Sequence, residues 1–308
     1  MEAITRSKVS KTRLLPQVRK LAPPLGQQAF RHTIQAGFAL FILFVTVQHV
    51  LAGENAATTV PSPEAYCPLG GLETLYRYVT SGGKFVPHAH LSNLVLLAAV
   101  FLTAILARSA FCGWVCPLGF LQDMAGGFSG FIQKRIPLVE QAVKGLKSRW
   151  APLAVIDRPL RLLKYGVLAW AVGGAALYTN MVFRDYDPWA ALINITEISI
   201  RPGLFVLGIL ILASFFVQRP WCRYACPLGA VSGLMGWLSP VRVKREASLC
   251  KSCAVCSKAC PMGLPVHKAN TVTSPDCTGC LECVAACPRK GALELKVEMP
   301  VAGIRKHQ

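Results

Sequence analysis

The sequence lacks the motifs on which many soluble enzymes depend. It contains no glycine-rich phosphate loop, no dinucleotide-binding fingerprint and no Ser/His/Asp arrangement that would activate a nucleophile. These absences exclude the common nucleotide-dependent enzymes and serine hydrolases. The Cys-x-x-Cys-His motif is also missing, which excludes a covalently attached c-type haem.

Charge is scarce as well, and acidic residues are the scarcer kind. Only 16% of the 308 residues are charged while 53% are hydrophobic, and the mean hydropathy is +0.43. This composition excludes an ordinary soluble protein and predicts a membrane protein. Fifteen Asp and Glu residues stand against 33 Lys and Arg, for a formal net charge of +18. In a membrane protein such an excess belongs to cytoplasmic loops, so we expect no nucleic-acid partner.

Cysteine, in contrast, is abundant, with thirteen residues. Eight of them follow the spacing C-x-x-C-x-x-C-x-x-x-C-P twice, from Cys250 and from Cys277. In bacterial two-cluster ferredoxins this run holds [4Fe–4S] clusters, and the cysteine before proline crosses to the other cluster. The spacing predicts one cluster on Cys250, Cys253, Cys256 and Cys287, and a second on Cys277, Cys280, Cys283 and Cys260. Structural zinc is the alternative, but zinc uses separated C-x-x-C pairs rather than such triplets.

Four apolar segments have roughly the length of a membrane span: residues 34–51, 91–111, 162–179 and 198–217. The loop between the second and third is rich in Lys and Arg, whereas the loops after the first and third are not. The positive-inside rule then places both termini in the cytoplasm. We therefore expect a basic cytoplasmic tail (residues 1–30), a four-helix transmembrane domain (31–240) and a cytoplasmic α+β two-cluster ferredoxin domain (241–308).

The transmembrane segments show an internal repeat. The second and fourth segments both run into C-x-x-x-C-P-L-G, at Cys112–Cys116 and at Cys222–Cys226. The first and third are followed by Tyr66-Cys67-Pro68 and Tyr186-Asp187-Pro188. Each copy has two spans, so both enter the membrane in the same sense. This predicts two parallel two-helix repeats about an axis along the membrane normal.

The repeat predicts two further sites. The thiols of Cys112, Cys116, Cys222 and Cys226 would converge as a third metal centre, most simply iron–sulfur, with zinc or two disulfides as alternatives. A cytoplasmic location disfavours disulfides. If each C-x-x-x-C turn is helical, its two thiols share one helix face and the following proline stops or kinks the chain. On the outer side, Cys67 and Asp187 would meet as a ligand or proton-transfer site, or Cys67 is simply part of a turn.

Four spans, two C-x-x-x-C-P motifs and a C-terminal two-cluster domain together resemble the NapH/NosR-type family of membrane quinol dehydrogenase and electron-transfer subunits. The resemblance covers nearly the whole chain after residue 30. The chain has no room for the large flavin-binding domain of the NosR branch, so its architecture is more similar to that of NapH.

The resemblance implies a multi-pass protein of the bacterial inner (cytoplasmic) membrane, in contact with membrane lipid. It implies an oxidoreductase component that exchanges electrons between menaquinol or ubiquinol and a partner redox protein, which would carry iron–sulfur or haem groups or be a reductase subunit. Two alternatives stand beside it. One is a copper reductase or assembly factor for a respiratory oxidase, with Cys67 handling the metal. The other is a passive membrane anchor for a larger oxidoreductase complex.

Overall fold

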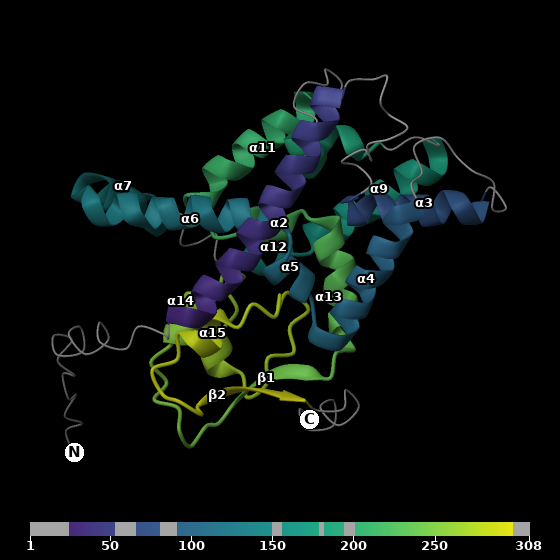
Figure 1. Ribbon diagram of the computed structural model, residues 1–308. Helices are drawn as coiled ribbons and strands as arrows, with labels where there is room; N and C mark the ends of the chain where they lie inside the picture. Colours follow the sequence, from purple (N-terminus) through teal and green to yellow (C-terminus); the bar gives the residue numbers. More distant parts are fainter. Residues whose placement is uncertain are drawn as a thin grey trace, which may run out of the picture.

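The computed structural model describes residues 25–52, 66–80, 91–149, 156–178, 182–193 and 201–297. Within these ranges the chain is mostly helical, with a two-stranded sheet near its C-terminal end (Figure 1). Residues 1–24 of the predicted tail and residues 298–308 lie outside the description. Helix α2 begins at Leu25, so the predicted boundary at residue 30 falls inside a helix.

The four predicted apolar segments correspond to four helices: α2 (Leu25–Ala52), α4 (Leu91–Ala107), α9 (Leu163–Tyr178) and α11 (Arg201–Ser214). Two stretches, Gln28–Leu51 and Asp157–Leu177, are long and apolar enough to cross a membrane. The helical parts of the second and fourth segments, Ser92–Ala107 and Pro202–Ser214, are shorter than expected.

The second helix ends early for a backbone reason, and a left-handed residue also stands directly before the short helix that follows the fourth. Arg108, directly after α4, has φ 61°, and Arg219, five residues after α11, has φ 49°. A left-handed residue other than glycine is costly and interrupts a right-handed helix. Each chain then enters a short helix, α5 (Ala110–Trp114) or α12 (Pro220–Tyr224).

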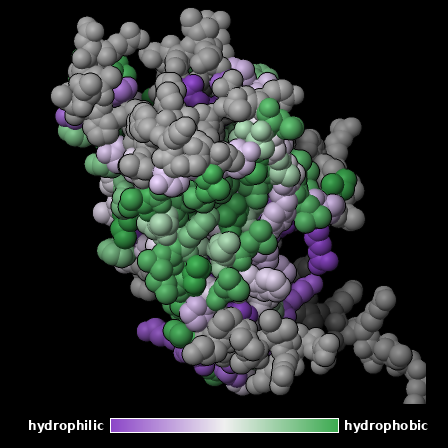
Figure 2. Space-filling view, turned by 90° about the vertical axis from the view of Figure 1, so that its right-hand side faces the viewer, coloured by the Kyte–Doolittle hydropathy of each residue, from purple (hydrophilic) through white to green (hydrophobic). Residues whose placement is uncertain are grey.

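The remaining helices pack around these four. They are α3 (Pro68–Thr80), α6 (Pro117–Arg135), α7 (Pro137–Arg149), α8 (Asp157–Leu160), the 3₁₀ turn η4 (Arg184–Tyr186), α10 (Pro188–Ile193) and α13 (Pro227–Trp237). Helices α6 and α7 project to one side, whereas α3 and α9 lie on the other (Figure 1). Many large apolar side chains on this bundle point outward, among them Val79, Val95 and Leu102. Figure 2 shows a broad hydrophobic band across this face, as expected for a surface in lipid.

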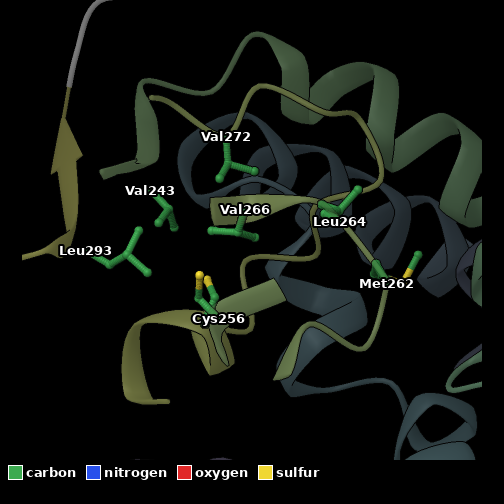
Figure 3. Close-up of a cluster of buried hydrophobic side chains, with 8 residues drawn as sticks. Val243, Cys256, Met262, Leu264, Val266, Val272 and Leu293 are labelled. Atoms are coloured by element: carbon green, nitrogen blue, oxygen red, sulfur yellow. The ribbon is translucent and has the colours of Figure 1, made fainter. Parts of the chain in front are cut away.

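The C-terminal part is a ferredoxin-like domain. Strand β1 (Val241–Arg245) pairs antiparallel with β2 (Leu293–Val297), with Val241 opposite Val297. Between them lie α14 (Val255–Ala259), the 3₁₀ turn η6 (Val266–Lys268) and α15 (Glu282–Ala285). Its core consists of Val243, Cys256, Met262, Leu264, Val266, Val272, Cys283 and Leu293 (Figure 3).

The ferredoxin-like domain packs directly against the helical bundle. The buried guanidinium of Arg108 donates hydrogen bonds to the carbonyl oxygens of Val272 and, at 2.7 Å, Ser274. Gly113 on α5 lies so close that a Cβ there would approach the carbonyl oxygen of Thr278 to 2.6 Å. Helix α2 begins beside α15, where Gln28 donates to Glu282 at 2.6 Å (Figure 1).

Candidate metal centres

The first cysteine set of the ferredoxin-like domain lines a single cavity. Cys250, Cys253 and Cys256 share it with Cys287, which comes from the second motif. The backbone N–H of Ser252 donates to the Sγ of Cys250 at 3.5 Å. This hydrogen bond, followed by that from Arg245, lowers the pKa of the Cys250 thiol. The four predicted ligands of one cluster therefore face a common space that contains a thiolate-stabilising donor.

The second set lies deeper. Burial raises the pKa of Cys283 well above its usual range, and the neighbouring thiols of Cys280, Cys277 and Cys260 raise it further. That effect requires these four side chains to lie near one another, as the crossed ligand pattern predicts. Cys256 and Cys283 share the same core cluster, so the two sets adjoin; Figure 3 shows the Cys256 sulfur inside it.

Each C-x-x-x-C-P motif joins two helices, which differs from the expected single helical turn. Cys112 lies on α5 and Cys222 on α12, whereas Cys116 and Cys226 are the N-cap residues of α6 and α13. The N-cap cysteines are extended, with ψ 115° and 113°. A residue before proline is pushed out of the helical region, and proline is favoured at the first helical position. The prolines therefore begin new helices rather than ending old ones.

The two copies contact each other reciprocally. The Sγ of Cys112 lies 3.7 Å from the hydroxyl oxygen of Ser232 on α13, and Gln122 on α6 donates to the Sγ of Cys222 at 3.5 Å. Gln122 and Ser232 each follow the first cysteine of their own motif by ten residues. Exchange of equivalent contacts between two copies is the pattern that a two-fold axis produces.

The four motif cysteines gather around this contact. Cys116 and Cys226 line the same cavity. Burial raises the pKa of Cys226 well above its usual range, and the nearby thiols of Cys222, Cys112 and Cys116 raise it further. The backbone N–H of Gly229 donates to the Cys226 Sγ at 3.3 Å. We call these four residues the inner cysteine set.

The donor chemistry of the inner cysteine set suits a thiolate-bound cluster. All thirteen cysteines are thiols rather than disulfides. Across the ranges that the structure describes, no three His, Cys, Asp or Glu side chains converge tightly enough to hold one metal ion. Burial raises the pKa of Cys112 to about 11, and a metal would bind this sulfur as the thiolate.

Arg219, which flanks the second C-x-x-x-C-P motif in the sequence, is buried beside this set. Arg219 has no exposed surface, and its guanidinium donates to both carboxylate oxygens of Asp123, at 2.7 and 2.5 Å, and to the carbonyl of Cys112 at 3.0 Å. Burial raises the pKa of Cys280 to about 11, while the charge of Arg219 acts in the opposite direction. Burial likewise raises the pKa of Cys222, and Arg219 again opposes it. One cation therefore faces thiols of both the inner set and the ferredoxin-like domain.

The inner cysteine set adjoins the second ferredoxin set. Cys222 packs against the core cluster of the ferredoxin-like domain. A Cβ on Gly113, the residue after Cys112, would lie 3.4 Å from the Cα of Cys280. The indole N–H of Trp114 donates to the carbonyl of Gly279 at 3.1 Å. Backbone contact thus links the two sets without an intervening layer of side chains.

The outer residues also come together. Cys67 and Asp187 both line a cavity of about 360 Å³ between α3 and α9, and both line a second of about 140 Å³. The second cavity reaches Cys116 and Cys226. Asp187 is the residue before α10 and accepts a hydrogen bond from the backbone N–H of Trp189 at 3.1 Å. Burial raises the pKa of Asp187 to about 7.

Two family models and several curated proteins match parts of this sequence. Residues 242–288 match the family described as 4Fe-4S dicluster domain, and residues 89–137 and 202–246, which contain the inner cysteine set, match the 4Fe-4S binding domain family. No solved structure matches the chain.

Among curated relatives, the protein named for electron transport, YccM of Escherichia coli (strain K12), is 30% identical over 258 residues, which cover 80% of this chain and 68% of that protein. The Ferredoxin-type protein NapH of Haemophilus influenzae is 28% identical over 210 residues, covering 64% of this chain and 67% of NapH. The Regulatory protein NosR of Pseudomonas aeruginosa is 27% identical over 186 residues, covering 57% of this chain but 23% of NosR. These similarities and the paired 4Fe–4S regions confirm the resemblance seen in the sequence: the chain belongs to the NapH/NosR-type 4Fe–4S family.

Proposed function

We propose that the protein is a membrane-embedded subunit that exchanges electrons between a quinol and a partner redox protein. One observation carries this proposal: the thiol sets form a continuous series. The cavity beside Asp187 reaches Cys116 and Cys226, the inner cysteine set adjoins Cys280, and the second ferredoxin set adjoins the first. The series ends at the surface, where Cys253 is exposed.

The ligand assignment follows the cysteine sets. Cys250, Cys253, Cys256 and Cys287 would hold one [4Fe–4S] cluster, and Cys277, Cys280, Cys283 and Cys260 a second. The inner cysteine set would hold a third iron–sulfur centre. When bound, such clusters accept and release single electrons. The chain itself supplies thiolates, backbone N–H donors such as that of Gly229, and a water-poor interior.

The same arrangement supports a membrane orientation. The apolar helices would make four spans in two parallel repeats, with the second and fourth broken at Arg108 and between Ser214 and Pro220. Broken helices are tolerated in membranes where protein covers the freed backbone groups. The reciprocal contacts of Cys112 and Cys222 support the repeat, and the loop charges favour a cytoplasmic ferredoxin-like domain in a bacterial inner membrane.

The exposed end of the series favours an acidic partner. Three basic residues, Arg245, Lys251 and Arg289, line the cavity of the first cysteine set. Positive side chains around an exit point speed encounter with a negatively charged surface and make it dependent on ionic strength.

The proposal is tested on the full chain, purified anaerobically in detergent. Reduction by a quinol should give the low-temperature EPR signals of iron–sulfur clusters. The double variant Cys112→Ser/Cys222→Ser should keep the iron of both ferredoxin clusters, lose the iron of the third centre, and lose reduction by quinol. Cys67→Ser, which removes a thiol outside all three sets, should keep all iron. Full iron content and full quinol reduction in the double variant would overturn the third centre, and a wild-type chain that quinol cannot reduce would overturn the function.

A further inference from the structure

The cavity between α3 and α9 shares Cys67, Asp187 and Trp189 with the smaller cavity that reaches Cys116 and Cys226. Its walls are mostly apolar and aromatic, with few polar groups: Tyr76, Asn93 and Arg184 in addition to Cys67 and Asp187. A volume of about 360 Å³ suits one small ring system, and binding sites of this kind combine apolar walls with a few placed polar atoms.

Trp189 supplies an unsatisfied donor at this place. It lines both cavities, only 9% of its surface is exposed, and its indole N–H has no hydrogen-bond partner among the residues that the structure describes. A buried donor without a partner is costly, at about 1–3 kcal/mol. Asp187, two residues earlier, offers carboxylate oxygens beside the same space. A donor and an acceptor on adjoining walls match a ring that carries both a carbonyl and a hydroxyl oxygen, or alternates between them.

The rim of the cavity points to a ligand that comes from the lipid phase. Leu75, Val79 and Val172 line it and are exposed by 40%, 69% and 41%. Because these exposed rim residues are apolar, an apolar tail could leave the cavity without meeting water.

We propose that this cavity is the quinol site, in which Asp187 accepts a hydroxyl proton and the indole N–H of Trp189 donates to a ring oxygen. The inference rests on the proposed function and assigns its substrate to one place in the chain. The smaller cavity, which joins Cys67 and Asp187 to Cys116 and Cys226, supplies the short route from the ring to the inner cysteine set.

The oxidation balances as follows. One quinol becomes one quinone and releases two electrons and two protons. Breaking the first O–H bond gives a proton to the Asp187 carboxylate, and the second proton leaves through the same carboxylate once it has released the first to water on the outer side. The two electrons leave one at a time for the iron–sulfur centres, and the partner redox protein receives both.

The protonation state of Asp187 sets how the rate of quinol oxidation depends on pH. With a pKa raised to about 7 by burial, the carboxyl is protonated and inactive as an acceptor below that pH, and ionised above it. The rate should therefore rise with pH up to about 7 and level off. The other titratable groups that face the two cavities are Arg184, Tyr66, Tyr76, Cys67, Cys116 and Cys226.

The decisive variant is Asp187→Asn. Asparagine caps a helix as well as aspartate does, so the hydrogen bond to the Trp189 backbone is kept and only the proton acceptor is lost. Full-length protein is assayed with decylubiquinol for electron transfer and with oxidised decylubiquinone for binding by calorimetry. Asp187→Asn should lower the oxidation rate by about 100-fold and flatten its pH profile, while binding of the oxidised ring is unchanged. Trp189→Phe should weaken binding by about two- to tenfold, the loss of one hydrogen bond.

The control is Asp185→Asn. Asp185 is half-buried, lies two residues away and lines neither cavity, so this variant should keep the oxidation rate, its pH profile and the binding of the oxidised ring. The same benzoquinone ring without its decyl tail should bind more weakly than decylubiquinone. Wild-type rate and pH profile in Asp187→Asn, with unchanged binding in Trp189→Phe, would refute the site. Dithionite checks that the clusters accept electrons. If the wild-type chain binds decylubiquinone at this cavity but quinol never reduces its clusters, the site stands and the proposed function fails.

Discussion

Replacing Arg219 by methionine tests how much the buried Arg219–Asp123 ion pair contributes to the stability of the protein. The side chain has no exposed surface, and its two hydrogen bonds to Asp123 measure 2.7 and 2.5 Å. Methionine keeps much of the length and apolar volume but removes the charge. It leaves the largely buried Asp123 carboxylate facing Arg31, whose guanidinium nitrogen lies 3.3 Å away.

The expected cost follows from this geometry. Removing one partner of a buried ion pair destabilises a protein by about 3–5 kcal/mol, because the other charge remains buried. Since Arg31 still faces Asp123, we expect the lower end, about 3 kcal/mol. Replacing both partners with apolar groups is often neutral, so Arg219→Met/Asp123→Leu should cost clearly less than Arg219→Met alone.

The assay is chemical denaturation of the full-length protein in detergent under anaerobic conditions, followed by circular dichroism and by cluster absorbance. Arg135→Met is the control, because Arg135 is exposed near the end of the same helix as Asp123 and should cost no more than about 0.5 kcal/mol. A loss below about 1 kcal/mol for Arg219→Met, or a double variant that costs the sum of its two singles, would show that the pair does not support the fold as the geometry indicates.

Three further predictions concern the metal centres and their setting. Gly113→Ala inserts a methyl group 2.6 Å from the Thr278 carbonyl and should destabilise the protein by about 1–3 kcal/mol, whereas Gly127→Ala, with open space around it, should be neutral or stabilising by thermal denaturation. Cys256→Ser should lose about four irons of one cluster while the others remain, by iron analysis and EPR, and uniform loss from all centres would contradict the ligand assignment. A reporter fused after Gln308 should be cytoplasmic and one inserted at Glu64 extracytoplasmic; the reverse at either site would overturn the orientation.

The sequence predicts the parts of this protein that depend on local spacing. The doubled cysteine run specifies the ferredoxin-like domain because its ligands sit at fixed short intervals. The sequence also shows the repeated C-x-x-x-C-P-L-G motif at Cys112 and Cys222, and it predicts the approximate positions of the apolar helices. Cys67 and Asp187, which the repeat pairs, line the same cavities, and their role as a site stays a prediction.

Other features depend on contacts between distant segments or on backbone geometry that spacing alone does not reveal. No local pattern pairs Arg219 with Asp123, or shows that the buried indole N–H of Trp189 lacks a partner within the described ranges. The helices that begin at Pro117 and Pro227 could have been anticipated, because a residue before proline avoids the helical region. The early end of the second apolar helix at Arg108 was not predicted, since arginine rarely adopts a left-handed conformation.

The close seating of the ferredoxin-like domain has a kinetic consequence. Glycines at 113 and 233 approach backbone carbonyls of residues 278 and 275 so closely that a methyl group would collide with either, and Arg108 ties two more carbonyls to the bundle. Some electron carriers work by swinging a head domain between donor and acceptor, and such a stroke slows in viscous solvent. Here backbone contacts hold the ferredoxin-like domain against the helical bundle. Electron transfer between these two parts should therefore proceed at the same rate in glycerol as in water. Only the diffusional encounter with a redox partner should slow as the solvent becomes more viscous.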